Sequence, residues 1–172
     1  MTNRLARLCL AGLLLLAAGR LPAQGSARHS AEAQIRDNEA RWNHEFEQRD
    51  LAKMVAHYAD DATMIAPGFP AFHGRDTIRA GLEQMLTDTA FSLRFETSRV
   101  EVSRAGDVAW SEGSYTVRMT DPNTKKPVSS SGSYVTVYRL EAGGWRAVSD
   151  IASPGPEPAA QALAEKETTN ER

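Results

Sequence analysis

The chain has 172 residues, of which 41% are hydrophobic and 24% are charged. This composition is typical of one ordinary globular domain and excludes a disordered or fibrous protein. A net charge of −2 does not indicate the basic face that nucleic-acid binding requires, so we expect no nucleic-acid partner.

The N-terminal segment has the layout of a secretory signal peptide. Arg4 and Arg7 precede an apolar run over residues 8–18, and small residues follow the run. This run is shorter than the ~20 residues that a membrane-spanning helix needs. We therefore predict that residues 1–23 are a cleaved signal peptide, that the protein is exported to the periplasm or secreted, and that it has no stable membrane insertion after cleavage.

The sequence lacks the motifs of several kinds of catalytic, metal-binding and cofactor-binding sites. Cys9 is the only cysteine and lies in the predicted signal peptide, which excludes disulfides, thiolate metal sites and cysteine nucleophiles from the mature protein. No HxH or HExxH spacing occurs, so the sequence predicts no metal site. Glycine-rich phosphate loops and a GxSxG nucleophile elbow are also missing, and we expect no cofactor.

The first helix is predicted from a regular apolar spacing. Residues 24–32 are polar and are interpreted as a linker. Ile35, Glu39, Trp42 and Phe46 then recur at intervals of three and four residues, which is the spacing of one helix face. The Glu39 carboxylate on this face has two interpretations: it either reaches solvent at the helix edge or projects into a polar cavity.

Residues 50–82 carry helix, strand, turn and helix signals in quick succession. Asp50 is suited to cap a short helix whose apolar face extends to Tyr58 and which stops at residues 60–61. Residues 62–66 have the composition of a short strand, which Pro67 and the glycine after it end. A third helix is expected after Gly74, with these residues facing inward: Ile78, Leu82, Met85 and Leu86.

This segment resembles a known family. The run Tyr58-x-x-Asp61-Ala62-Thr63, followed by Pro67 and then by Gly74-Arg75 with Ile78, is similar to the signature of the NTF2-like superfamily, in its SnoaL-like and DUF4440 branch. The resemblance covers residues 33–153. It implies the α+β cone of ketosteroid isomerase: three N-terminal helices packed on a strongly curved antiparallel sheet that encloses a pocket. It also implies pairing into a homodimer.

Strand signals continue to residue 152. Phe91, Leu93 and Phe95 alternate with polar residues, but Val100 has the opposite parity, which predicts a β-bulge near residues 98–99. Residues 121–127 and 142–144 have turn compositions that predict two hairpins. The prolines at 154, 156 and 158 precede a polar end, so residues 154–172 are interpreted as a disordered tail.

The resemblance also assigns catalytic positions, and this chain departs from each of them. The isomerase base corresponds to Ala66, whose methyl group cannot take a proton. The tyrosine of its oxyanion hole corresponds to Trp42, and its protonated aspartate lies near Thr136. Ketosteroid isomerase activity by that route is therefore not expected, and whether the protein is an enzyme stays open.

Aromatic and soft side chains predict a small-molecule pocket, although simple core packing explains them equally well. The predicted ligand-binding residues are Trp42, Tyr58, Met64, Phe69, Phe72, Trp110, Tyr134 and Thr136.

Three polar residues are catalytic candidates: His73, Glu112 and Asp150. Glu112 enters a pocket only if Trp110 does, because the two share strand parity. Asp150 lies on the face opposite Trp145 unless a bulge intervenes.

Three functions follow from these patterns. The first is an exported domain that binds a small apolar or amphipathic molecule. The second is a lyase, isomerase or hydrolase that uses His73, Glu112 or Asp150 with a bound water. The third is a noncatalytic homodimeric interaction module with a filled cavity. A cavity with two convergent titratable groups favours the second, and a solidly packed cone favours the third.

Overall fold

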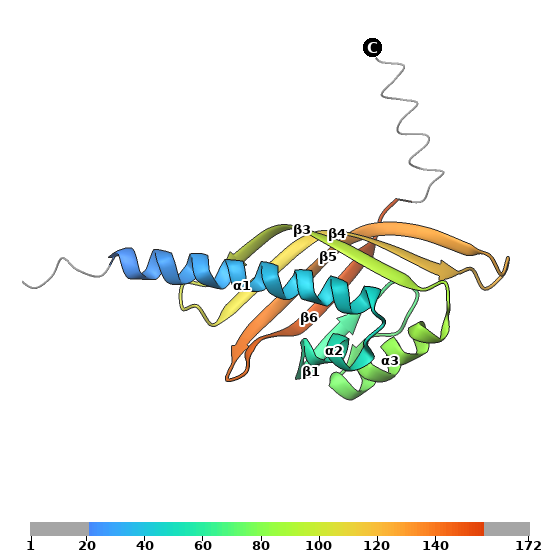
Figure 1. Ribbon diagram of the computed structural model, residues 1–172, viewed down its shortest axis with the longest axis horizontal. Coiled ribbons are helices and arrows are strands. Elements are labelled where there is room, and N and C mark those ends of the chain that lie inside the picture. Colours follow the sequence, from blue (N-terminus) through green and yellow to red (C-terminus); the bar gives the residue numbers. More distant parts are fainter. Residues whose placement is uncertain (1–20, 157–172) are drawn as a thin grey trace, which may run out of the picture.

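The computed structural model describes residues 21–156, so the predictions for residues 1–20 and 157–172 lie outside it. In this part, three helices pack on a six-stranded sheet (Figure 1). The elements in chain order are α1 (Leu21–Glu47), α2 (Leu51–Ala56), β1 (Tyr58–Ile65), β2 (Phe72–His73), α3 (Arg75–Thr87), β3 (Ser92–Val102), β4 (Val108–Thr120), β5 (Pro127–Glu141) and β6 (Gly144–Pro154).

Helix α1 begins earlier than the sequence pattern predicts. It starts at Leu21, so residues 24–32, which the sequence analysis interprets as a linker, are helical. This segment contains no proline that would interrupt a helix, and helix formation does not require an apolar face of its own. Arg28 anchors this segment to the sheet by donating to the Val102 carbonyl oxygen at 3.4 Å.

The boundary between helix α2 and strand β1 lies earlier in the chain than the sequence pattern predicts. The Asp50 carboxylate caps α2 by accepting from the Lys53 N–H at 3.2 Å, as predicted. The helix nevertheless ends at Ala56, and Tyr58 begins β1 by pairing with Ala147 of β6. Pairing with a strand far along the chain thus overrides the local helical spacing.

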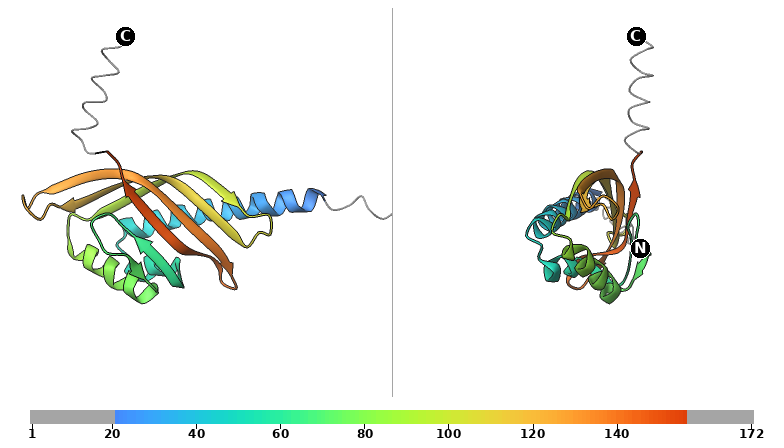
Figure 2. Two further views of the ribbon diagram at one scale, coloured as in Figure 1. Left: turned by 180° about the vertical axis from the view of Figure 1, so that it is seen from behind. Right: turned by 90° about the vertical axis from the view of Figure 1, so that its right-hand side faces the viewer.

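The sheet is mixed rather than purely antiparallel. Its strand order is β2-β1-β6-β5-β4-β3, and β1 runs parallel to β6. The strands from β3 to β6 follow one another through short turns and are antiparallel, whereas β1 and β6 are separated by most of the domain. The expected α+β fold, with helices packed on a strongly curved sheet, is confirmed. The sheet curls into an open trough, and the helices lie across its concave side (Figure 2).

The predicted bulge in β3 is present. The pairing of β3 with β4 shifts register between Thr97 and Arg99, opposite Gly113. A Cβ atom on Gly113 would clash with the Glu96 carbonyl oxygen, so this close approach of two backbones requires glycine. Because of the bulge, β3 turns its apolar residues toward the core on both sides of the shift.

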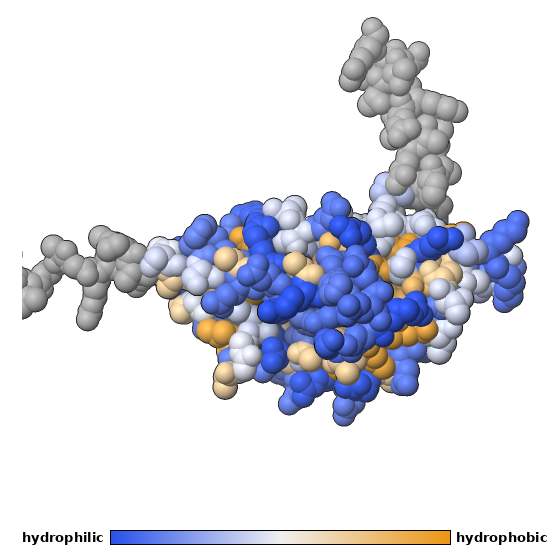
Figure 3. Space-filling model, in the orientation of Figure 1, coloured by the Kyte–Doolittle hydropathy of each residue, from blue (hydrophilic) through white to orange (hydrophobic). Residues whose placement is uncertain are grey.

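The core lies between the helices and the concave face of the sheet. Buried residues of α1 and α3, such as Ile35 and Ile78, belong to one core there with Ala109, Tyr138 and Ala147 of the sheet. In Figure 3 the surface is mostly hydrophilic, with an apolar region where the sheet meets α3. The interior near that region is hollow.

Candidate functional site

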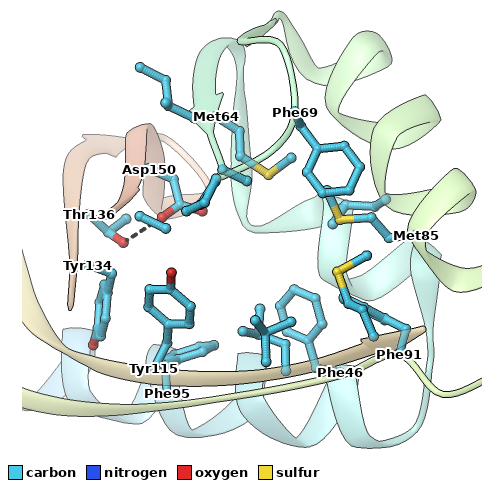
Figure 4. A pocket seen from close by; sticks show the side chains of 18 of the residues that line it. Phe46, Met64, Phe69, Met85, Phe91, Phe95, Tyr115, Tyr134, Thr136 and Asp150 are labelled. Atoms are coloured by element: carbon cyan, nitrogen blue, oxygen red, sulfur yellow. Dashed lines mark hydrogen bonds between the residues drawn. The ribbon is translucent and has the colours of Figure 1, made fainter. Parts of the chain in front are cut away.

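A cavity of about 200 Å³ lies between the concave face of the sheet and the segment from β1 to α3 (Figure 4). We call it the pocket. It is lined by Trp42, Phe46, Tyr58, Met64, Ile65, Ala66, Pro67, Phe69, Leu82, Met85, Phe91, Leu93, Phe95, Tyr115, Val117, Met119, Ser130, Tyr134, Thr136, Asp150, Ala152 and Pro154.

The apolar walls follow from strand alternation. In β4, Tyr115, Val117 and Met119 share one parity, and all three face the pocket. Met64 of β1 and Met85 of α3 contribute the opposite wall (Figure 4). Two-residue and helical periodicities therefore bring apolar side chains to a common space, as the sequence predicts.

Asp150 forms the polar end of the pocket. Its two carboxylate oxygens accept hydrogen bonds from the Tyr58 hydroxyl at 2.6 Å and from the Thr136 hydroxyl at 3.2 Å. The Tyr115 hydroxyl points into the cavity from the facing wall (Figure 4). The Tyr58 hydroxyl oxygen also lies 3.3 Å from the Met64 sulfur.

A bulge in β6 brings Asp150 into the pocket. Ala147 pairs with Tyr138, but Ser149 pairs with the adjacent residue Val137, so Val148 is the extra residue. The parity of the strand reverses there, and Asp150 faces the same side as the buried Trp145. Without this bulge, Asp150 would lie on the outer face of the sheet.

The environment of Asp150 favours its neutral form. Burial raises the pKa of the Asp150 carboxyl above its ordinary value, although the hydrogen bonds from Tyr58 and Thr136 oppose this shift. Burial also raises the pKa of the Tyr58 phenol, and the adjacent Asp150 charge raises it further. Two titratable groups with raised pKa values therefore meet at one end of the pocket.

The raised pKa of Asp150 predicts a pH-dependent stability. From about pH 4 upward the unfolded Asp150 loses its proton while the folded one keeps it, so stability falls as pH rises through the folded pKa. Asp150→Asn removes this titration. We expect the free energy of unfolding of the wild type to decline relative to the variant from pH 4 to 8 in urea titrations. A constant difference across this range would contradict the raised pKa.

A buried carboxylate lies behind the pocket. Glu39 of α1 is 1% exposed and accepts hydrogen bonds from four hydroxyls. Tyr134, Tyr138 and Thr97 each donate at 2.6 Å, and Ser111 also donates. Of the two sequence interpretations, Glu39 therefore projects into a polar interior. Because Tyr134 lines the pocket, this network fixes one of the pocket walls.

Trp42 lies between the pocket and the hydrogen-bonded pair of His57 and Glu45. Its ring stacks on His57 at 4.7 Å between centroids and meets Tyr58 edge-on at 5.0 Å. His57 is bonded to Glu45 at 2.6 Å, and burial lowers the pKa of His57. The Trp42 indole nitrogen is buried and has no hydrogen-bond partner among residues 21–156.

Comparisons with known proteins identify the family. The model of the SnoaL-like domain matches residues 40–148. The chain belongs to the SnoaL-like domain family. No curated protein matches it.

Solved structures share the NTF2-like fold of this SnoaL-like domain. A ketosteroid isomerase-like protein from Erwinia carotovora atroseptica SCRI1043 has a TM-score of 0.63 and 22% identity, covering 73% of this chain and 97% of its own. An NTF2-like protein with a cystatin-like fold from Novosphingobium aromaticivorans has a TM-score of 0.64 and 20% identity, covering 87% and 97%. An NTF2-like protein of unknown function from Pseudomonas putida KT2440 has a TM-score of 0.60 and 24% identity, covering 76% and 92%. At these identities the similarity shows the fold alone.

The SnoaL-like domain brings together most, but not all, of the predicted ligand-binding residues. Trp42, Tyr58, Met64, Phe69, Tyr134 and Thr136 line the pocket. Phe72 does not line it; its ring covers Gly81 of α3 and lies 6.3 Å from Phe69. Trp110 lies on the outer face of the sheet, where the Arg99 guanidinium stacks over it at 5.0 Å. The expectation that Trp110 enters the pocket is therefore wrong, because its parity is opposite to that of Tyr115.

Of the three polar candidates, only Asp150 reaches the pocket. His73 is exposed on β2 and interacts with the Thr63 hydroxyl at 3.2 Å. Glu112 shares the outer face with Trp110 and pairs with Val135. Ala66 lines the pocket and contributes only a methyl group to it.

Several pocket residues outside the predicted ligand-binding set also follow from the periodicity of the sequence. Phe95 and Tyr115 have the alternation that predicts an inward face, and Phe46 lies on the apolar stripe of α1. Within residues 21–156, no group of three His, Cys, Asp or Glu side chains is placed to hold a metal ion. Nor does that range contain a helix long and apolar enough to cross a membrane.

Proposed function

We propose that this SnoaL-like domain binds a small apolar or amphipathic molecule in the pocket. The observation that carries this proposal is an apolar cavity with one polar end, in which Asp150, Thr136 and Tyr58 lie together. Small-molecule sites usually combine apolar walls with a few polar groups that fix orientation. The apolar part of the ligand would contact the walls, and its polar group would face Asp150.

The volume of the pocket limits the size of the ligand. An apolar cavity of about 150 Å³ accommodates benzene. The pocket, at about 200 Å³, therefore suits a single ring with a short substituent, or a short aliphatic chain. Ile65, Ser130 and Pro154 line the pocket and are also exposed, so the pocket opens to solvent at their end.

Benzyl alcohol is a suitable neutral probe. We expect calorimetry to show saturable binding to the wild type and at least tenfold weaker binding to Ala152→Leu, which fills the pocket from β6. Ala142→Leu adds the same bulk at an exposed position outside the pocket and should leave binding unchanged. Equal affinity in all three proteins would place the binding site elsewhere.

We also propose that the domain is exported after removal of a signal peptide. The proposal rests on the charged, apolar and small-residue layout of residues 1–23, which lie mostly outside the described part. The mature protein should begin between residues 20 and 28. Mass spectrometry of exported protein tests this, and an intact Met1 would refute it.

A homodimer through the outer face of the sheet is a further proposal. Val135 and Ile151 are neighbours across β5 and β6 on this face, and they are 39% and 41% exposed. Adjacent exposed apolar side chains on several strands mark interaction surfaces. Light scattering at tens of micromolar should give the dimer mass for the wild type. Val135→Lys should give the monomer mass, and a monomeric wild type would contradict the proposal.

Turnover is a second candidate function, favoured by the convergence of Asp150 and Tyr58. Asp150 is the carboxylate of the pocket and could accept a proton from a bound molecule, a role that Ala66 cannot fill. Loss of turnover in Asp150→Asn, with benzyl alcohol binding intact, would establish an enzyme. Intact turnover in that variant would exclude Asp150 as the base.

A further inference from the structure

The pocket has an uneven distribution of charge. Among the described residues that line it, Asp150 alone carries a charged group, and none is Lys, Arg or His. A ligand carboxylate or phosphate would therefore meet one carboxyl and no cation. A positively charged ligand would meet a single group of opposite sign.

Asp150 retains hydrogen-bonding capacity for a ligand. A carboxylate offers about four acceptor positions. The hydroxyls of Tyr58 and Thr136 occupy one position on each oxygen, at 2.6 and 3.2 Å. The remaining positions suit an N–H donor, and Figure 4 shows that Asp150 borders the open space of the cavity.

The walls around this acid are aromatic. Eight of the 22 lining residues are Phe, Tyr or Trp, and Phe95 meets Tyr134 edge-on at 5.5 Å. The faces of aromatic rings attract cations, and this attraction is stronger in sites from which water is excluded. One carboxylate within aromatic walls is an arrangement that recognises an organic cation more readily than an anion.

We propose that the ligand of the pocket is a small amine, bound as its ammonium form with the nitrogen at Asp150 and the apolar part against the aromatic walls. This inference rests on the proposed pocket binding and specifies its ligand class. The ammonium donates to the Asp150 oxygens that Tyr58 and Thr136 leave free. It also favours the ionised carboxylate, because an adjacent opposite charge stabilises that form.

Three probes of similar size test the charge preference: benzylamine, benzyl alcohol and benzoate. At neutral pH benzylamine is a cation, benzyl alcohol is neutral and benzoate is an anion. Calorimetry on the wild type should give benzylamine about tenfold tighter binding than benzyl alcohol, the scale of one charge-assisted hydrogen bond. Benzoate should bind about tenfold more weakly than the alcohol, since its charge must be desolvated beside the Asp150 carboxyl and no lining residue supplies a cation.

Asp150→Asn keeps the shape of the side chain and removes its charge. In this variant the advantage of benzylamine over benzyl alcohol should disappear, while benzyl alcohol still binds. Equal wild-type affinities for amine and alcohol, or an amine preference that persists in the variant, would overturn the amine proposal and leave pocket binding intact. Failure of all three probes to bind the wild type would overturn both. The wild-type comparison decides the question even if the variant does not fold.

Discussion

Glu39→Ala is expected to lower the free energy of unfolding by about 4 kcal/mol. Each buried hydroxyl that loses its acceptor costs about 1–3 kcal/mol. Four hydroxyls donate to Glu39, although Thr97 and Tyr134 are also within 3.0 Å of each other and can retain one bond. Urea denaturation followed by tryptophan fluorescence measures the loss.

Two matched variants identify the origin of that loss. Glu39→Gln keeps a carbonyl oxygen in place and should lose less stability than the alanine variant. Glu47→Ala removes an exposed carboxylate from the same helix and should change stability by no more than about 0.5 kcal/mol. A loss below about 1 kcal/mol in Glu39→Ala would mean that the four hydroxyls find other acceptors.

Trp42→Ala is expected to have an effect of similar size on stability and a further effect on binding. Trp42 is 3% exposed and packs on His57, Tyr58 and Phe95, and truncation of a buried tryptophan costs about 3–5 kcal/mol. The variant also loses a wall of the pocket. Affinity for benzyl alcohol, measured on the folded fraction, should fall about tenfold or more.

Trp110 and His73 provide the controls for this comparison. Trp110 lies on the outer face, so Trp110→Ala should cost less stability than Trp42→Ala and leave affinity unchanged. His73→Ala alters an exposed residue outside the pocket and should affect neither property. Asp150→Ala should weaken binding of the neutral probe less than Trp42→Ala does. Unchanged affinity in folded Trp42→Ala would show that this residue serves only as core.

Much of the fold could be predicted because local patterns and the final structure agree. The Asp50 cap, the apolar face of α3 and the reversal of parity near Ser98 all arise from neighbouring residues. The parallel pairing of β1 with β6 could not be predicted in this way. It depends on residues that are far apart in sequence, such as Tyr58 and Ala147.

The site was less predictable than the fold because small shifts of register decide its composition. Parity separates Tyr115 from Trp110 once one of them is known to face inward. Asp150 is different, since only the extra residue Val148 turns it toward the pocket. The helical spacing places Glu39 on the apolar face of α1, but its role as an acceptor depends on hydroxyls contributed by β3, β4 and β5.

Methyl NMR of the methionines tests binding in the pocket most directly. Met64, Met85 and Met119 line the pocket, whereas Met54 is buried in α2 outside it and serves as an internal reference. On titration with benzyl alcohol, the three pocket methyls should shift together and saturate with a single dissociation constant, while the Met54 methyl stays in place. Saturable shifts confined to Met54, or no saturable shift at Met64, Met85 and Met119, would contradict binding in the pocket.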